Sequence, residues 1–420
     1  MGSTKNSSYK TLFALIISGE MIFSLPFHLT RYFRPSILEA FSISNAELGD
    51  AFAIYGVTAM LSYFPGGLLA DRFSIRFLMS GSLVATSLGG LYLLSIPNSF
   101  ELSLLYGYWG ITSILFFWAA LIKATRQWGG VFSQGKAFGF LDGGRGLAAA
   151  TFATVSVLIF SFLLPDQSEA IENSDRIFAL QIIILYYVFI TLLTAIIIWF
   201  CLPNDDNDKV ETKIKVRISL PKLNRIFNKE LLLIALTVVC AYCGYKGLDN
   251  MTLYLTQTLN WHEANAASFA AYATYLRPVS AISAGYLADK FDCNKTIGVL
   301  FFISSIIYFC LFTIVPNENI SWIIYLNILV TFLAVFALRG IYFALLQNAK
   351  FPKNKTGTIV GIVSLIGYTP DIFFASITGR LLDSSPGLIG HQNYFLFLCF
   401  VSVVGLIISF FLRKNDSQTI

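Results

Sequence analysis

Long apolar runs separated by short polar loops dominate the chain. A run of about 20 apolar residues can cross a bilayer as a helix. We place twelve predicted spans, at 10–34, 46–70, 77–96, 101–125, 136–164, 177–202, 231–258, 264–288, 296–315, 321–348, 356–381 and 392–412. A membrane β-barrel would instead show segments of about 10 residues with alternating polarity, which is not the pattern here. The sequence therefore predicts an all-α membrane protein with 12 transmembrane helices.

Composition supports a membrane environment. Of the 420 residues, 56% are hydrophobic and only 13% are charged, whereas about a quarter of residues are charged in soluble proteins. The first apolar run is too long for a signal-peptide core and is followed by further spans, so we expect it to be retained as a helix. We expect a multi-pass protein of a bacterial-type inner membrane.

Basic residues are concentrated in every second loop. The loops with Lys and Arg contain Arg72, Arg76, Lys123, Arg126, Lys136, the region from Lys209 to Lys229, Lys290, Lys295, Lys350, Lys353 and Lys355, and the tail adds Arg413 and Lys414. The opposite loops, 96–100, 260–263 and 315–320, have no Lys or Arg, and 165–175 carries only acids. The positive-inside rule then predicts that both termini and the basic loops face the cytoplasm. Because topology explains the basic loops, we expect no nucleic-acid partner.

A polar segment and a repeated motif divide the chain in two. Residues 203–229 form the only long polar interruption, which predicts an N-terminal half at 1–202, a cytoplasmic linker and a C-terminal half at 230–420. Gly67-Leu-Leu-Ala-Asp71-Arg72 lies between the second and third spans of the first half, and Gly285-Tyr-Leu-Ala-Asp289-Lys290 occupies the matching place in the second. Internal repeats of this kind are typical of secondary transporters, whose substrates bind near the bilayer midplane.

With these motifs the chain resembles a permease of the major facilitator superfamily over essentially its whole length. The residues that fit the family's loop signature are Gly67, Asp71, Arg72 and Arg76 in the first copy, and Gly285, Asp289 and Lys290 in the second. Ser74 stands where the signature usually has glycine. The resemblance implies that this cluster is a latch for one conformation of the transport cycle. We expect Gly67 to let two helices approach, and Asp71 to accept hydrogen bonds at a helix N-terminus and to pair with a cation.

Two shorter stretches resemble particular branches of that family. Tyr245-Lys246-Gly247, with Tyr254-Leu255 and Arg277-Pro278 downstream, is similar to helices 7 and 8 of the organophosphate antiporters, although Lys246 replaces the usual arginine. This resemblance implies that Lys246 and a symmetry mate in helix 1, for which Arg31 is the candidate, bind the anionic group of a substrate. The stretches 138–146 and 366–371 resemble uncharacterised bacterial inner-membrane permeases.

Several charged residues are predicted at bilayer depth, where each costs on the order of 2.5–3.5 kcal/mol without a partner or a function. They are Glu20, Arg31, Asp142, Arg145, Lys246, Asp249, Arg277, Arg339 and Asp371. Arg277 has no acid within helical reach on its own span and a planar fork suited to carboxylate or phosphate. By helix rise, Lys246 and Arg277 lie about 22 Å and about 20 Å along their spans from opposite sides. We therefore expect substrate contacts from Arg31, Lys246 and Arg277, with Tyr242 and Tyr275 beside them.

Several of these charges have alternative assignments. A carboxylic acid in an apolar cavity can alternate between neutral and ionised forms, so Glu20, Asp249 and Asp371 are candidates for proton coupling, and salt bridges to arginines are the alternative for Glu20 and Asp371. Asp142 and Arg145, three residues apart on one helix, are predicted to form a buried pair, either structural or functional. The same spacing lets Asp249 neutralise Lys246. Arg339 either braces its helix end or contacts the substrate.

Together these features predict a secondary active transporter that works by alternating access. We expect it to move a small organic anion with a proton or against a counter-anion, as a monomer and without cofactor or metal. An efflux exporter with an apolar substrate is the alternative. The sequence has no phosphate-binding loop for an ATP-driven pump, no soluble output domain for a receptor, and no nucleophile or metal-ligand constellation for an enzyme.

Overall fold

The computed structural model describes residues 9–129, 134–165, 171–202, 229–317, 321–348 and 356–417. These residues are helical, with no strand among them. Contacts group the chain into two units, one of residues 1–43, 50–216 and 262–271, the other of residues 44–49, 217–261 and 272–420. The predicted linker lies outside the described residues except for Lys229, so the predicted boundaries of the halves stay a prediction.

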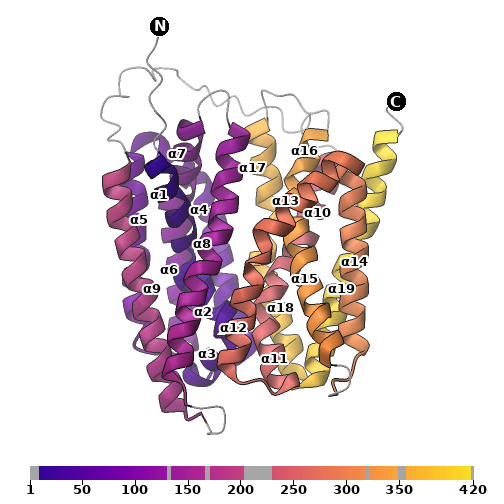
Figure 1. Cartoon of the computed structure of the whole chain (residues 1–420). Helices are drawn as coiled ribbons and strands as arrows, with labels where there is room; N and C mark the ends of the chain where they lie inside the picture. The colour runs from indigo at the N-terminus through magenta and orange to yellow at the C-terminus, as the bar shows by residue number, and fades with distance from the viewer. Residues whose placement is uncertain are drawn as a thin grey trace. The chain divides into compact units, whose positions relative to one another are not determined.

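The first unit is built from the N-terminal helices. They are α1 (Tyr9–Met21), α2 (Leu29–Tyr32), α3 (Arg34–Phe41), α4 (Asn45–Arg72), α5 (Ile75–Leu93), α6 (Ser99–Ile111), α7 (Ala119–Gly129), α8 (Gln134–Leu163) and α9 (Asn173–Cys201), with π-helical turns at Ser24–His28 and Thr112–Trp118. Within this unit, α5 packs along α9, and α1 packs against α8 and α9 (Figure 1). The core between them includes Leu15, Met79, Phe117 and Ile198. The first turn of α4 groups with the other unit.

The second unit is built from the C-terminal helices. They are α10 (Lys229–Gly247), α11 (Met251–Leu259), α12 (Glu263–Thr274), α13 (Leu276–Phe291), α14 (Cys293–Thr313), α15 (Ser321–Ile341), α16 (Leu345–Asn348), α17 (Thr356–Gly367), α18 (Pro370–Ser384) and α19 (Leu388–Ser417), with 3₁₀ turns at Leu248–Asn250 and Tyr342–Ala344. α14 packs along α19, α13 along α15, and α10 against α17 and α19. Residues 263–271 of α12 group with the first unit.

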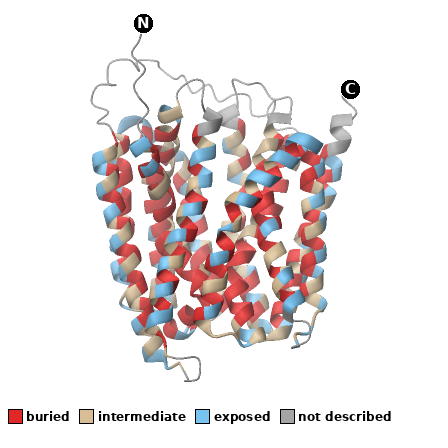
Figure 2. Ribbon diagram, in the orientation of Figure 1, coloured by how far each residue is buried: buried red, intermediate tan, exposed pale blue. Residues whose placement is uncertain are grey.

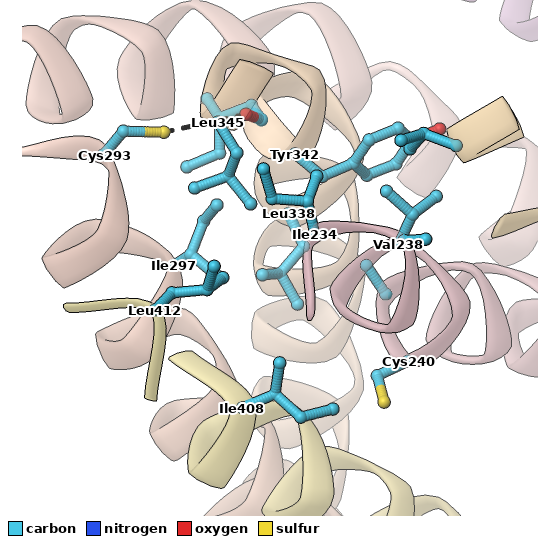
Figure 3. Packing of buried hydrophobic residues seen from close by; sticks show 14 of the residues in the cluster. Ile234, Val238, Cys240, Cys293, Ile297, Leu338, Tyr342, Leu345, Ile408 and Leu412 are labelled. Atoms are coloured by element: carbon cyan, nitrogen blue, oxygen red, sulfur yellow. Dashed lines mark hydrogen bonds between the residues drawn. The ribbon is translucent and has the colours of Figure 1, made fainter. Parts of the chain in front are cut away.

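A dry apolar core holds the second unit together. Figure 3 shows Ile234 of α10, Ile297 of α14, Leu338 of α15 and Leu412 of α19 converging in this core. At its edge the thiol of Cys293 donates to the carbonyl of Ile341, with an S–O distance of 3.8 Å. Lys246 of α10 lies one to two helical turns after the last core residues of that helix, Cys240 and Ala241. The core therefore fixes the position of the end of α10 that carries Lys246.

Most predicted spans appear as helices long and apolar enough to cross a bilayer. Nine helices of the described residues qualify, and ten if the bent pair Tyr9–Met21 and Ser24–Tyr32 is one span. That pair bends by 42°, beside Pro26, which cannot donate a backbone hydrogen bond. The predicted spans at 77–96 and 264–288 correspond to α5, which is rich in Ser and Gly, and to α12 with α13, which a break at Tyr275 divides. The predicted all-α membrane fold is confirmed.

Exposed apolar side chains show which solvent the outer faces require. In Figure 2, buried and exposed residues alternate around individual helices of each unit. Among the exposed ones are large apolar residues on α8 and α9, such as Phe162 and Phe200. Such side chains are costly to expose to water but not to lipid. The outer faces are therefore suited to lipid.

The close helix contact predicted at Gly67 occurs one residue earlier. A Cβ added at Gly66 would lie 2.8 Å from the carbonyl oxygen of Leu115 in the second π-helical turn, whereas one added at Gly67 or Gly285 would meet no neighbouring atom within 4 Å. The prediction for Gly67 was wrong because successive residues of a helix point about 100° apart, and it is Gly66 that faces the neighbouring backbone. On α8, Gly144 likewise faces a neighbour, Ile16 of α1.

Candidate functional site

Buried ion pairs form two clusters, one in each unit, while Arg34 and Arg277 are buried outside them. We call the first the Glu20 cluster and define it as Glu20, His28 and Arg145. We call the second the Lys246 cluster and define it as Lys246, Asp249, Asp371 and Tyr242.

In the Glu20 cluster one carboxylate lies between two basic side chains. Nε2 of His28 is 3.1 Å from Oε1 of Glu20, and Nε of Arg145 donates to Oε2 at 3.2 Å. The exposed fractions are 6% for Glu20, 3% for His28 and 9% for Arg145. A buried carboxylate is stable as an ion only when it is paired and hydrogen-bonded. Both of its oxygens are used here, so Glu20 is held as a fully paired carboxylate.

Local breaks in the helices bring these three residues together. Glu20 lies in the last turn of α1, and His28 ends the π-helical turn that follows it. Gly19 gives Arg145 room, because a Cβ there would lie 3.2 Å from Cδ of the arginine. The guanidinium of Arg145 also lies over the ring of Trp118, at 5.8 Å from the ring centroid. It therefore reaches Glu20 past Gly19 and beside the ring of Trp118.

The predicted buried pair of Asp142 and Arg145 was wrong in one partner. Arg145 is buried and pairs with Glu20 on α1, but Asp142 is exposed on the surface of α8. Residues three apart on a helix are offset by about 60° around its axis, which is enough here to turn one side chain outward and the other inward. The salt-bridge alternative considered for Glu20 is the arrangement found.

In the Lys246 cluster one ammonium lies between two carboxylates. Nζ of Lys246 is 3.3 Å from Oδ1 of Asp371 and 3.9 Å from Oδ2 of Asp249. The hydroxyl of Tyr242 donates to both oxygens of Asp371, at 3.0 Å and 3.1 Å. Lys246 and Asp249 are buried, and the side chain of Asp371 is 20% exposed. The predicted pairing of Lys246 with Asp249 is confirmed, and Asp371 pairs with a lysine instead of an arginine.

Helix breaks position this cluster as well. Lys246 lies in the last turn of α10, directly before the 3₁₀ turn that contains Asp249. Asp371 lies in the first turn of α18, after a break at Tyr368 and Thr369 and a proline at the first helical position. The N-terminus of a helix carries partial positive charge, which stabilises a carboxylate there. The sequence thus places Asp371 where its ionised form is supported from two sides.

Tyrosines and a second cation surround the Lys246 cluster. The ring of Tyr242 packs edge-on to Tyr368 at 4.9 Å and lies stacked on Tyr245 at 5.9 Å between centroids. The guanidinium of Arg339 lies 3.7 Å from the centroid of the Tyr245 ring, a cation–π distance. Arg339 therefore lies against Tyr245, which stacks on the substrate candidate Tyr242, and does not simply reach outward from its helix end.

The other predicted substrate-binding residues lie elsewhere. Arg277 is buried in the first turn of α13, just after Tyr275, which is half-exposed at the break between α12 and α13. Arg31 is half-buried on the short helix α2. All three lie at or beside the helix breaks at Phe33 and Tyr275. Their role in substrate binding stays a prediction.

The predicted latch residues lie at exposed helix ends. Asp71, Arg72, Asp289 and Lys290 are exposed, and the guanidinium of Arg76 lies 4.3 Å from the centroid of the Trp199 ring on α9. Nζ of Lys123 donates to the carbonyl of Ala70 at 2.8 Å, which places a cation at the C-terminal end of α4. The latch itself stays a prediction.

Sequence reasoning missed His28. It lies eight residues after Glu20, a spacing that would put the two side chains about 12 Å apart along an unbroken helix. Only the bend and the wider turn at Ser24–His28 bring the imidazole back to the carboxylate. The signal in the sequence was Pro26, between the two residues in a predicted span.

Comparison with known proteins shows which family the chain is similar to. The family model described as Major Facilitator Superfamily matches residues 16–375, and this match confirms the predicted resemblance. Two similar curated proteins come from Escherichia coli K12. Inner membrane protein YihN is 27% identical, with 97% of this chain and 96% of that protein covered. Inner membrane protein YqcE is 25% identical, with 97% and 95% covered.

Solved structures share the fold at lower sequence identity. A bacterial homologue of the human lysosomal transporter Spinster, in an inward-facing and occupied conformation, aligns with a TM-score of 0.75 at 16% identity and covers 99% of both chains. The nucleoside transporter NupG aligns with a TM-score of 0.68 at 11% identity, covering 96% of this chain and 99% of that one. At such identities the likeness is one of fold alone.

Proposed function

The chain belongs to the Major Facilitator Superfamily, and on that premise we propose that it moves a small organic anion across the inner membrane by alternating access. The coupling is to a proton or to a counter-anion. Its family and fold are those of a membrane transporter, and its similar curated proteins are inner membrane proteins. The anion and the coupling are the parts that the clusters support and that experiments must test.

The observation that carries this proposal is the Lys246 cluster. The buried ammonium of Lys246 has two carboxylate partners. Its Nζ lies 3.3 Å from an oxygen of Asp371 and 3.9 Å from an oxygen of Asp249. A proton bound to Asp371 would remove one of the two negative charges beside Lys246. The ammonium could then attract another anionic group. An anionic group could then take the place of Asp371. This exchange would link the movement of an anion to that of a proton.

The charge balance of the second unit supports the same substrate class. Among its residues predicted at bilayer depth, Lys246, Arg277 and Arg339 contribute three positive charges, and Asp249 and Asp371 contribute two negative ones, which leaves one positive charge. Charge surplus inside a low-dielectric site attracts ligands of opposite sign. Arginine adds a planar fork that fits carboxylate or phosphate.

The exporter alternative rests on a specific observation too. With Asp371 ionised, the two carboxylates more than balance the charge of Lys246. Tyr242 stacks on Tyr245 and meets Tyr368 edge-on, so the three rings form an aromatic group. Such a group suits an uncharged aromatic or apolar substrate. The two proposals differ in whether ligand affinity depends on the charge of the ligand.

Substitution of Arg277 tests the anion. Purified protein is screened by thermal shift against carboxylates and phosphate esters, with neutral and cationic analogues. The anion found is then measured with Arg277→Gln, which should abolish its binding, and with Arg277→Lys, which should retain part of it at best because the fork is lost. Arg380→Gln is the matched control, since Arg380 is an exposed arginine on α18. Normal transport by both Arg277→Gln and Lys246→Gln, or an uncharged or cationic substrate, would replace this proposal with the exporter.

The membrane topology is part of the proposal. We expect both termini and the 203–229 linker in the cytoplasm, with a monomer as the working unit. Reporter fusions after Asn228 and at the C-terminus should be active only in the cytoplasmic format. Periplasmic activity at either position would overturn the span order.

A further inference from the structure

The Glu20 cluster contains two bases that share one acid. Arg145 donates to one oxygen of Glu20, and His28 meets the other. Arginine carries its charge at all accessible pH values, whereas histidine changes charge near neutral pH in water. Arg145 keeps its charge, and Glu20 is held ionised by a base on each of its oxygens. His28 is therefore the side chain of the three whose charge can change.

We propose that His28 binds a proton during the transport cycle and that Arg145 controls this binding by competing for Glu20. The proposal rests on the chain being a transporter that changes conformation, but not on the substrate being an anion. It moves the proton-coupling role in the first unit from Glu20 to His28, with Glu20 as the fixed counter-charge.

Charge balance gives the reason for the competition. With His28 neutral, Glu20 and Arg145 sum to zero, and an added proton would leave one uncompensated positive charge in a buried site, which is costly. When Arg145 moves away from Glu20, the remaining pair of Glu20 and neutral His28 carries one negative charge. A proton on His28 then restores neutrality. Proton uptake and the Glu20–Arg145 contact therefore exclude each other.

The surroundings of His28 leave a place for the incoming proton. Its ring meets Tyr32 and Tyr187 edge-on, each at 5.8 Å between centroids, and the hydroxyl of Tyr187 is 3.0 Å from that of Ser156. Glu20 contacts the ring at Nε2, and Arg145 contacts the other oxygen of Glu20. Together with Tyr32 and Tyr187, they are the titratable and charged groups that the described contacts place around the ring. Nδ1 of His28 is buried without a hydrogen-bond partner among the described residues. A neutral imidazole that donates from Nε2 would take its second proton at that atom.

The break in the first span gives this site a way to respond to conformational change. Glu20 and His28 lie on the two sides of the 42° bend, so a change in the bend changes their separation. The carbonyl of Pro26 accepts from the hydroxyl of Tyr106 at 2.9 Å, which ties the π-helical turn to α6. Arg145 lies on a third element, α8. Movement of α8 relative to α1 would break the contact between Glu20 and Arg145. Glu20 would then keep His28 as its remaining partner in the cluster.

Histidine-selective NMR can test the proposal without a substrate. The chain has only three histidines, His28, His262 and His391, so the full-length protein, labelled at histidine, carrying a tag without histidine and held in lipid nanodiscs, gives three sets of ring signals. His28→Gln assigns the one of interest. Arg145→Gln should raise the proton affinity of His28 on the order of ten-fold, and Glu20→Gln should lower it by a similar factor. Arg176→Gln, which breaks another arginine–glutamate pair of the same unit, should leave it unchanged.

The two variants act in opposite directions, so a partly unfolded sample cannot imitate the result. If either variant fails to fold, Arg145→Lys, which keeps the charge but not the guanidinium contact, supplies a smaller upward change. A His28 signal that titrates identically in the wild type, Arg145→Gln and Glu20→Gln would overturn the proposal, as would a His28 that stays neutral across the accessible pH range in Arg145→Gln. If the anion proposal alone fails, these titrations are unaffected, because no substrate is present.

Discussion

The Glu20 cluster and the Lys246 cluster follow one plan with opposite charges. In the first, a carboxylate lies between an imidazole and a guanidinium. In the second, an ammonium lies between two carboxylates. Each central residue lies on the first predicted span of its half, and each long-range partner, Arg145 or Asp371, lies on the fifth. The plan is thus repeated while its charges are reversed.

A helix break beside each central residue makes the plan possible. The π-helical turn at Ser24–His28 follows Glu20, and the 3₁₀ turn at Leu248–Asn250 follows Lys246. Each break turns a nearby partner, His28 or Asp249, back toward the centre. Breaks are costly in lipid unless neighbouring helices satisfy the freed backbone groups, so their presence at both centres fits functional positions better than random defects.

The reversal of charge indicates which ligand each cluster can accept. When Arg145 leaves Glu20, a proton on His28 can replace its positive charge. When Asp371 is neutralised, an anion can replace its negative charge beside Lys246. The surroundings differ accordingly. Trp118 and Phe23 line Arg145, while hydroxyl-bearing tyrosines surround Asp371 and Lys246. The predictions below test this division of roles.

Loss of the central base should have the largest effect. Lys246→Gln leaves the carboxylates of Asp249 and Asp371 without their cation, and it should lower anion transport roughly 100-fold, since removing one partner of a buried charge pair costs about 2 to 5 kcal/mol. Transport into proteoliposomes at equal reconstitution measures it. The double variant with Asp371→Asn should restore thermal stability but not transport. Full transport by the double variant would show that Lys246 only balances its own acids.

Loss of the central acid should mainly affect stability. Glu20→Gln leaves Arg145 and His28 without their shared acceptor and should lower the free energy of unfolding by about 3 kcal/mol. Asp142→Asn, one turn away from Arg145 on the exposed face, should change it by no more than about 0.5 kcal/mol. Unfolding in SDS or by heat compares the two. A larger effect at Asp142 would restore the pair that the sequence predicted and break the comparison.

The repeated loop motif should affect turnover and not binding. Asp71→Asn should lower turnover about ten-fold at unchanged apparent affinity, and Asp289→Asn should lower it less, because a charge at a helix end biases one conformation without touching the substrate. Initial rates over a substrate series at equal expression separate the two parameters. Wild-type rates in both variants would remove the latch assignment.

The smallest effect separates two adjacent glycines. Gly66→Ala forces a Cβ against the backbone at Leu115 and should destabilise the first unit by about 1 to 2 kcal/mol. Gly67→Ala meets open space and should be neutral or slightly stabilising, since alanine favours helix. Melting temperatures of the two variants test this. Equal destabilisation would show that the contact at Leu115 does not limit packing.

Much of the fold could be predicted from the sequence, because lipid imposes long apolar helices and a repeat leaves matching motifs. The chemistry of single residues could be read less well. Asp371 and Lys246 were singled out by the cost of buried charge, but their mutual contact joins spans far apart in the sequence. His28 depends on a bend that no periodicity describes, and Asp142 was misassigned because spacing along a helix does not say which face is covered. Local pattern determines the elements, and tertiary packing determines the partners.

The exchange of Asp371 for an anion at Lys246 is the central claim, and transport by Asp371→Asn tests it most directly. The asparagine can still accept from Tyr242, but it carries no charge and binds no proton. With the anion identified by the thermal-shift screen, proteoliposomes containing this variant should exchange anion for anion at a rate within about three-fold of the wild type, because Lys246 is permanently available. They should fail to accumulate the anion under a proton gradient. Loss of both activities, or accumulation as in the wild type, would contradict the account.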